Sequence, residues 1–423
     1  MDFNTILSLS VFIVVLALII SEKVNRTVAA LAGACVVIIV HIFSGEKALE
    51  YIDFNTIGVL IGMMIIVGIV KNTGIFEYLA VFAAKKAKGD PWKIIVSLCI
   101  ITAVTSALLD NVTTVLLIVP MTFVITQTLE LEPIPFLIPI ILAANIGGTA
   151  TLIGDPPNIM IGSAAGIDFM DFVVNLLPVI IVIFIVTFAV LKLNYRNKLQ
   201  VSDDKKMQIV ELDEKVCIKN STLLKKCIFV LCLVMLGLFF HSNLGYSSAA
   251  IALTGATLLL LISGESIDEA MMSVEWPTIF FFAGLFILVG SLEEVGLIDK
   301  LAKVVISITD NNLLFTGILI IWFSAILSAF LDNIPFVATL IPLIQAMGAS
   351  GLNITPLWWA VSLGACLGGN GSLIGASANV VVAGLAGKYG YKLSFGEYLK
   401  TGFPLMILSI VLSTIYLVVF YLI

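Results

Sequence analysis

One polar signature occurs twice in this apolar chain, and its two copies lie about 222 residues apart. Ser106–Pro120 reads SALLDNVTTVLLIVP and Ser328–Pro342 reads SAFLDNIPFVATLIP, with seven of fifteen positions identical. Each copy places an Asp-Asn pair, Asp110-Asn111 or Asp332-Asn333, inside an otherwise apolar stretch. A carboxylate at bilayer depth costs about 2.5 kcal/mol or more, so it is usually functional. A duplicated pair of interrupted hydrophobic segments also indicates the binding site of a transporter.

A second motif is duplicated with nearly the same offset. Ala144–Asn158 reads ANIGGTATLIGDPPN and Ala365–Asn379 reads ACLGGNGSLIGASAN, again with seven of fifteen positions identical. Three further glycines keep this register, since Gly62, Gly68 and Gly74 recur as Gly284, Gly290 and Gly296. Chance similarity between apolar helices would not keep glycines and amides aligned, so the sequence predicts an internal repeat.

The composition predicts a protein that is solvated by lipid. Of the 423 residues, 60% are hydrophobic and only 12% are charged, whereas soluble chains carry about 25% charged residues. Two histidines, cysteines without CxxC spacing, and the lack of Walker, GxSxG and HExxH sequences argue against an ATP-driven pump or an enzyme. We expect no cofactor and no nucleic-acid partner. The run from Ile6 to Ile20 has no basic region before it and reads as the first span.

We predict an all-α polytopic membrane protein made of two inverted-topology repeats, each with five spans, a re-entrant helical hairpin and one broken helix. Repeat 1 covers 1–193, with its hairpin at 92–129 and its broken helix at 134–165. A polar linker at 194–226, with room for a short helix at 205–216, precedes repeat 2 at 227–423, whose hairpin is 313–347 and broken helix 356–387. The unbroken spans are expected at 3–20, 28–43, 55–70, 172–193, 227–241, 249–262, 277–292 and 403–422. Length leaves open whether the hairpins re-enter or span, but their turns lack Lys and Arg, which favours buried tips.

Basic residues set the expected orientation. A topology with a cytoplasmic linker and both termini outside leaves 19 Lys and Arg residues on the cytoplasmic side and three on the other. It requires five crossings per half, and because five is odd the second half is inserted upside down. We therefore expect a multi-pass protein of the cell membrane.

The interrupted segments supply the candidate site. Broken helices expose free N–H groups at one end and free C=O groups at the other, each worth about half a charge. Such backbone persists in a membrane only where it lines a site or is buried in protein, so we expect both hairpin tips and both breaks to converge. The candidate ligand-binding residues are Asp110, Asn111, Thr113, Thr114, Gly148, Thr149, Thr151, Asp155, Asn158, Asp332, Asn333, Gly369, Asn370, Ser372 and Asn379.

These side chains are oxygen or amide ligands without a basic group among them. Hard cations prefer such oxygens, which suggests a Na⁺ site at Asp110, Asn111 and Thr149. A buried carboxylate can instead take up a proton, because desolvation disfavours its charge. Structural roles stay open as alternatives. Asp110 and Asp332 could simply cap the second arm of each hairpin, Asp155 could belong to an ordinary turn, and the hydroxyls could satisfy local backbone.

At these motifs the chain resembles the ion transporter superfamily. It is most similar to the ArsB/NhaD permease family, within the group that includes the melanosomal P protein and the citrate-transporter-like permeases. The resemblance rests on Leu109-Asp-Asn-Val-Thr-Thr114 and on Gly147–Asn158, and it covers about residues 5–420. It implies an elevator-type secondary transporter, in which hairpins and broken helices move against a scaffold. A homodimer is common in the wider group, and the ArsB likeness leaves room for a separate ATPase subunit.

The resemblance leaves the substrate open. The sodium-coupled dicarboxylate branch carries Ser-Asn-Thr at its hairpin tips, whereas this chain has Asp110-Asn111-Val112 and Asp332-Asn333-Ile334. Two additional carboxylates would repel a dicarboxylate. A small inorganic ion or oxyacid fits better, with arsenite or antimonite efflux coupled to H⁺ or Na⁺ as the first expectation. The alternatives are a Na⁺/H⁺ antiporter, a sodium-coupled carrier of citrate-like organic anions, and an ion channel.

Overall fold

The computed structural model describes residues 3–21, 23–195 and 199–423, and it shows only helices and loops within those ranges. Nine of the helices there are long and apolar enough to cross a membrane. They are α1 (Phe3–Ser21), α4 (Phe54–Lys71), α6 (Pro91–Leu108), α7 (Asn111–Thr128), α10 (Phe169–Tyr195), α12 (Ser221–Leu244), α15 (Trp276–Glu294), α17 (Leu313–Phe330) and α21 (Phe395–Leu417). The prediction of an all-α polytopic membrane fold is confirmed.

Four shorter apolar helices join this set, and the remaining helices are shorter or more polar. The shorter apolar helices are α2 (Arg26–Ile39), α8 (Ile134–Gly148), α13 (Ser248–Ser263) and α18 (Asn333–Ala349). The others are α3 (Gly45–Glu50), α5 (Ile75–Lys86), α9 (Pro156–Ala165), α11 (Asp203–Glu211), α14 (Ile267–Met272), α16 (Leu297–Ile308), α19 (Thr355–Gly368) and α20 (Ser377–Lys388), with 3₁₀ turns at Glu214–Cys217 and Gly369–Gly371 and a π-helical end at Val418–Leu422.

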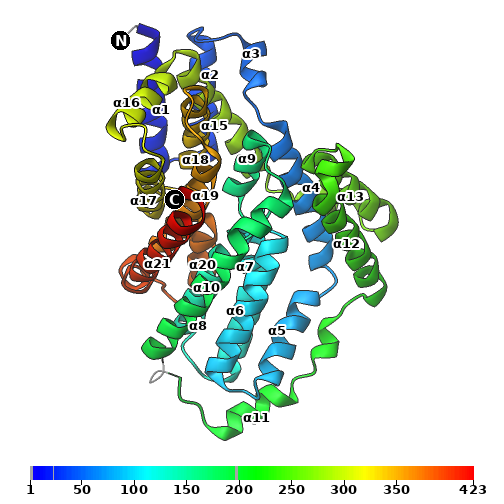
Figure 1. Cartoon of the computed structure of the whole chain (residues 1–423). Coiled ribbons are helices and arrows are strands. Elements are labelled where there is room, and N and C mark those ends of the chain that lie inside the picture. The colour runs from blue at the N-terminus through cyan, green and yellow to red at the C-terminus, as the bar shows by residue number, and fades with distance from the viewer. Residues whose placement is uncertain (1–2, 22, 196–198) are drawn as a thin grey trace.

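The internal repeat is visible helix by helix. Helices α1–α10 correspond in order to α12–α21, and α11 lies between the two sets. The register is tight in the middle of each half: α4 begins at Phe54 and α15 at Trp276, 222 residues later, and α7 and α18 begin at Asn111 and Asn333, also 222 apart. Figure 1 shows α6 and α7 towards the end that carries α11, and α16 towards the end that carries the N-terminus.

The repeated glycines explain how the halves interlock. A Cβ on Gly62 of α4 would lie 2.8 Å from the carbonyl oxygen of Ala252 in α13, and one on Gly284 of α15 would lie 3.0 Å from that of Ala30 in α2. Each glycine therefore allows one half's helix to pack closely against the other half's helix. The result is one helix group made of α1–α4 and α12–α15, in which α4 packs on α13 and α15 on α2.

The hairpins and broken helices form the second group. In the first half α6 packs against α8, and in the second α17 packs against α19, while α7 contacts α20 and α18 contacts α9 across the repeat. The two groups meet where α4 contacts α7 and α9, and where α15 contacts α18. The helices therefore fall into two groups, one built from α1–α4 and α12–α15 and the other from the hairpins and broken helices.

Four helices, α3, α5, α14 and α16, lie outside the spans that the sequence predicted. The two longer ones, α5 and α16, follow α4 and α15 in the same way. Each begins after a glycine in the left-handed region, Gly74 at φ 80° and Gly296 at φ 66°, which turns the chain sharply out of the preceding span. Both are 12 residues long and partly polar, so their hydropathy does not single them out.

The linker packs along one end of the molecule. Its helix α11 lies close to α5 and α7, and the 3₁₀ turn Glu214–Cys217 contacts α5. The backbone N–H of Lys219 donates to the carbonyl of Thr73 at 3.0 Å. A short helix was expected at 205–216, and α11 begins two residues earlier and ends at Glu211. The following span also starts earlier than expected, at Ser221 instead of 227.

Candidate functional site

Both hairpin tips and the first helix break line one small cavity, and the second break, which the sequence also predicted to converge there, contributes Ser377. The cavity measures about 30 Å³, which is room for one or two water molecules or a small ion. It lies where the two helix groups meet. Its lining is Arg26, Leu60, Met64, Asp110, Asn111, Val112, Asp155, Pro156, Glu275, Thr278, Asn333, Ile334 and Ser377.

The hairpin turns hold their carboxylates by capping. Oδ1 of Asp110 accepts the backbone N–H of Thr113 at 2.7 Å, and Oδ1 of Asp332 accepts that of Ile334 at 3.1 Å. Each aspartate therefore satisfies a free donor at the start of α7 or α18. The capping reading is correct as far as it goes. Each cap involves Oδ1 of the carboxylate, so the cap does not use Oδ2.

The first break carries an acid that the second lacks. Asp155 stands just before α9 and is buried, with 1% of its surface exposed. The side-chain amide of Asn333 donates to its two carboxylate oxygens at 3.3 and 3.4 Å. In the second break the position of Asp155 is taken by Ala376. The contact joins the tip of the second hairpin to the first broken helix.

A buried amide, Asn145, connects the two halves at the ends of α8 and α19. Its Nδ2 donates to Oδ1 of Asn370 at 3.0 Å and to Oδ1 of Asn379 at 2.9 Å. Its Oδ1 accepts Nδ2 of Asn111 at 3.2 Å. The carbonyl of Asn145 also accepts the hydroxyl of Thr149. One side chain thus links the first hairpin tip to the second break.

Two asparagines hold the breaks in shape. Nδ2 of Asn158 donates to the carbonyls of Thr149 and Thr151 at 3.1 and 2.9 Å, and Nδ2 of Asn379 donates to those of Gly369 and Ser372 at 2.8 and 2.9 Å. The broken backbone therefore finds its missing donors inside the protein.

Hydroxyls then join each break to its own hairpin. The hydroxyl of Thr151 donates to the carbonyl of Ala107. That of Ser372 donates to Ala329 in the second half. Ser106 and Ser328 in turn donate from the hairpin arms to the carbonyls of Ala144 and Ala365, both at 2.6 Å.

Glycines permit the crossing of each break. A Cβ on Gly148 would lie 2.5 Å from the carbonyl oxygen of Gly154, and one on Gly369 would lie 3.0 Å from that of Gly375. The predicted glycines therefore serve backbone packing at the breaks.

The predicted residues thus divide by place. The cavity lining includes Asp110, Asn111, Asp155 and Asn333, whereas Asp332 lies beside it. The residues engaged in the amide network or the breaks are Gly148, Thr149, Thr151, Asn158, Gly369, Asn370, Ser372 and Asn379. Thr113 gives its backbone to the Asp110 cap, and Thr114 has a buried hydroxyl without a hydrogen-bond partner among the described residues.

Several residues at the site were not predicted, and three of them, Arg26, Glu275 and Asn145, carry much of its polar chemistry. Arg26, the first residue of α2, binds the carboxylate of Asp332 at 2.6 Å, and Glu275 lines the cavity beside Thr278, whose hydroxyl it accepts at 3.1 Å. Both stand at span ends, where charges ordinarily signal only the membrane boundary. Asn145 lies inside the duplicated motif, but the aligned position of the other copy is Cys366, so the repeat did not single it out.

Acidic side chains outnumber basic ones at the site. Asp110, Asp155 and Glu275 line one cavity, and Asp332 is neutralised by Arg26. Within the part of the chain that the structure describes, no group of three or more His, Cys, Asp or Glu residues lies close enough to share a metal ion. The donor set therefore consists of separated carboxylates together with amides and hydroxyls, which suits a proton or a monovalent cation.

Comparison with known proteins agrees with this architecture. The model of the CitMHS family, described as citrate transporter, matches residues 16–364. The chain belongs to this family. It is 42% identical over 421 residues to an uncharacterised transporter of Mycobacterium tuberculosis, with 98% of each chain covered. It is 35% identical to the human P protein over 96% of its own length and 58% of that protein.

A solved structure shares the fold of this CitMHS member. The YdaH transporter of Alcanivorax borkumensis, whose crystal structure revealed an unusual topology, superimposes with a TM-score of 0.59 at 16% identity, covering 99% of this chain and 98% of that one. The resemblance to the ion transporter superfamily and to the P protein is confirmed. This protein is a multi-pass membrane protein of a transporter family.

Proposed function

We propose that this protein is a secondary active transporter that exchanges protons for a small monovalent cation, Na⁺ in the first place. The observation that carries the proposal is the water-sized cavity where both hairpin tips and the first break meet, lined by Asp110, Asp155 and Glu275. Carboxylates in a low-dielectric site gain either a proton or a cation readily. Competition between the two for the same carboxylates is the chemistry that an exchanger needs.

The same geometry argues against a large anionic substrate. A citrate-like anion would meet three carboxylates and one guanidinium already paired with Asp332. A cavity of about 30 Å³ also holds only one or two molecules of water size. Size and charge therefore both favour a cation.

Arsenite or antimonite efflux is the second candidate. The sequence favoured it, and one observation still supports it: Asp110, Asp155 and Asn111, which carry oxygen acceptors, line the same cavity. Neutral, hydroxyl-rich acids would donate hydrogen bonds to these oxygens. The small volume now ranks this substrate after Na⁺ and H⁺.

A second cavity lies at the boundary between the helix groups. It has a volume of about 300 Å³ and lies further along α9, α15 and α18, on the side of α3, and its polar lining includes Asp53, Ser163 and Glu293. In the proposed mechanism, the hairpins and broken helices move against α1–α4 and α12–α15. That movement would expose the acidic cavity alternately to each side of the membrane, as in an elevator.

The orientation is part of the proposal. We place the 194–226 linker in the cytoplasm and both termini outside, in the cell membrane, as the distribution of Lys and Arg favours. Membrane-impermeant thiol labelling of single cysteines at Ser202 and Ser44 in intact cells tests this, since only the second should react. Cross-linking would detect a homodimer, and a pulldown would detect a separate ATPase subunit.

The deciding experiment measures ion exchange in proteoliposomes. Purified protein is reconstituted with a pH dye inside, and Na⁺, Li⁺, choline or arsenite is added outside. Exchange predicts a pH change with Na⁺ that choline does not give. Asp110→Asn should abolish it, whereas Asp90→Asn, at the N-cap of α6 in the same hairpin, should leave it unchanged, because Asn caps helices as well as Asp does. Arsenite flux without a Na⁺ response would favour the second candidate.

A further inference from the structure

The two hairpin tips carry the same carboxylate in different surroundings. Asp332 accepts Nη1 of Arg26 at 2.6 Å and the hydroxyl of Ser377 at 3.1 Å, in addition to its helix cap. Asp110 accepts the backbone of Thr113 and has no ion-pair partner among the described residues. The pseudo-symmetric carboxylates are therefore electrostatically unequal.

The inequality traces to a single position of the repeat. Arg26 opens α2, and its counterpart 222 residues later is Ser248, which opens α13. Helix α2 of the first half packs against α15 of the second half, and its first residue, Arg26, contacts the hairpin tip of the second half. Ser248 carries no charge. Asp332 therefore has an ion pair with Arg26, whereas Asp110 has none among the described residues, although Arg26 also lines its cavity.

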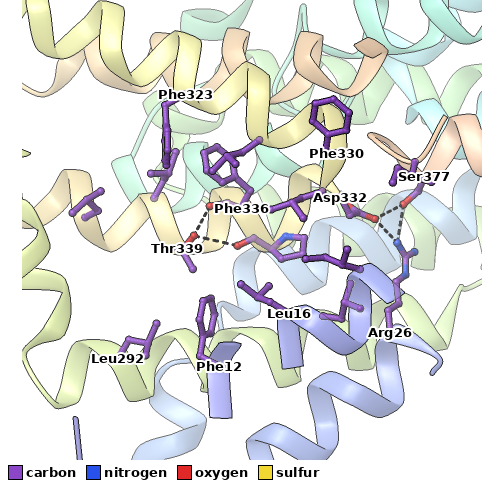
Figure 2. Close-up of a pocket in the computed structure, with 18 of the residues that line it drawn as sticks. Phe12, Leu16, Arg26, Leu292, Phe323, Phe330, Asp332, Phe336, Thr339 and Ser377 are labelled. Atoms are coloured by element: carbon purple, nitrogen blue, oxygen red, sulfur yellow. Dashed lines mark hydrogen bonds and ion pairs between the residues drawn. The ribbon is translucent and has the colours of Figure 1, made fainter. Parts of the chain in front are cut away.

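The guanidinium of Arg26 is held in place from several sides. Its Nη1 also donates to the hydroxyl of Ser377 at 2.8 Å, and its Cζ lies 5.2 Å from the centre of the Phe281 ring, close enough for a cation–π contact. Ser377 is the first residue of α20, directly after the second break. The guanidinium therefore bridges α2, the second hairpin tip and the second break. Figure 2 shows the three side chains joined at one end of a cavity.

The surroundings make the charge pair costly to disrupt. That cavity is about 580 Å³ and is lined almost wholly by apolar side chains such as Phe12, Leu16 and Phe336 (Figure 2). The carboxylate of Asp332 is mostly buried, with 13% of its side chain exposed against 32% for Arg26, and burial strengthens the attraction. Removing only the guanidinium would leave a lone carboxylate at membrane depth, which must then bind a proton or a cation.

We propose that Arg26 fills the second of two pseudo-symmetric cation sites with its own guanidinium, so that the protein carries one cation per cycle, at the Asp110–Asp155 side. The assignment of a transported cation rests on the proposed function, but the role of Arg26 does not. Arg26 is then the residue that sets the number of bound cations. Replacing it with a neutral residue converts Asp332 into a second site.

The test counts cations and measures stability in the purified full chain. Radioactive Na⁺ binding and thermal unfolding are recorded in Na⁺ and in choline, and at neutral and acidic pH. The variants are Arg26→Gln, Arg26→Lys and the double variant Arg26→Gln with Asp332→Asn. We expect Arg26→Gln to bind twice as much Na⁺ as the wild type and to lose thermal stability in choline, with recovery in Na⁺ or acid. Arg26→Lys should match the wild type, and the double variant should return to one Na⁺ without the added dependence.

Three results would overturn the proposal. Arg26→Gln could match the wild type in bound Na⁺ and in stability. It could remain unstable in every cation and pH while the double variant folds, which would make the pair a structural bridge that no cation replaces. The additional Na⁺ could also persist in the double variant. Absence of Na⁺ binding and exchange in the wild type would refute the proposed function instead, and the stability comparison would still decide the role of Arg26.

Discussion

Asn333 and Asp155 lie in opposite halves of the chain, yet the amide of Asn333 donates to both carboxylate oxygens of Asp155, at 3.3 and 3.4 Å. This contact fixes the tip of one hairpin against the broken helix of the other repeat. It also means that a movement of either element changes the hydrogen bonding of a buried acid. Binding at Asp155 and the position of the hairpin are therefore physically linked.

Neutralising Asp155 should slow exchange strongly without unfolding the protein. A hydrogen bond to a charged group contributes about 1.5–3 kcal/mol, so we expect Asp155→Asn to reduce Na⁺-driven proton flux by about ten- to a hundredfold. Flux in proteoliposomes and melting in detergent are the measurements. The control is Asp171→Asn, an exposed carboxylate near the start of α10 outside the cavity, which should retain full flux. Equal flux in wild type and Asp155→Asn would remove this acid from the mechanism.

Replacing Asn145 should damage both halves at once. Asn145→Cys, which copies Cys366 of the second repeat, leaves the Oδ1 atoms of Asn370 and Asn379 without the donor they share. Each unsatisfied buried group costs about 1–3 kcal/mol, so the melting temperature should fall clearly and transport should be lost. Cys366→Ser keeps a small polar group near Asn158 and should melt like the wild type. A wild-type melting curve for Asn145→Cys would show that the network is not needed for stability.

Alanine should be tolerated at some glycines and not at others. At Gly148 the new Cβ would lie 2.5 Å from the carbonyl oxygen of Gly154, a backbone atom that cannot swing away, so Gly148→Ala should express poorly or lose its folded fraction in size-exclusion chromatography. Gly384 in α20 has nothing within 4 Å of an added Cβ. Gly384→Ala should therefore raise stability by up to about 1 kcal/mol through helix propensity. The reverse order of the two variants would contradict the close crossing at the break.

The linker should detach at low pH. The ammonium of Lys85 forms a hydrogen bond with Glu214 and holds the pKa of that carboxyl below its usual value. A lowered carboxylate pKa stabilises the contact above the usual pKa of about 4.3, and the stabilisation is lost as the pH falls through the lowered value. The protection of the Glu214–Cys217 amides, measured as their exchange rate relative to the intrinsic rate at the same pH, should thus fall in acid. Glu214→Gln should show low protection at every pH; if it keeps the acid-dependent step, another group is responsible.

Much of this arrangement was readable from the sequence because the repeat preserved it. The Asp-Asn turns, the glycines of the breaks and Asn158 with Asn379 occur in both copies, and the structure places them at matching points. The repeat could not reveal residues that one copy alone contains. Arg26 matches Ser248 and Asn145 matches Cys366, and only their three-dimensional neighbours give them a role. The helices α5 and α16 were missed for another reason, since their partly polar composition reads as loop.

The single amide at Asn145 makes the two halves of the molecule unequal. A chain built from two copies of the second half would place cysteine at both of these positions, and neither copy could then donate to its neighbour's asparagines. In the protein as it stands, the donor comes from the first half and two of its acceptors come from the second. The two halves are therefore complementary at this point and not interchangeable.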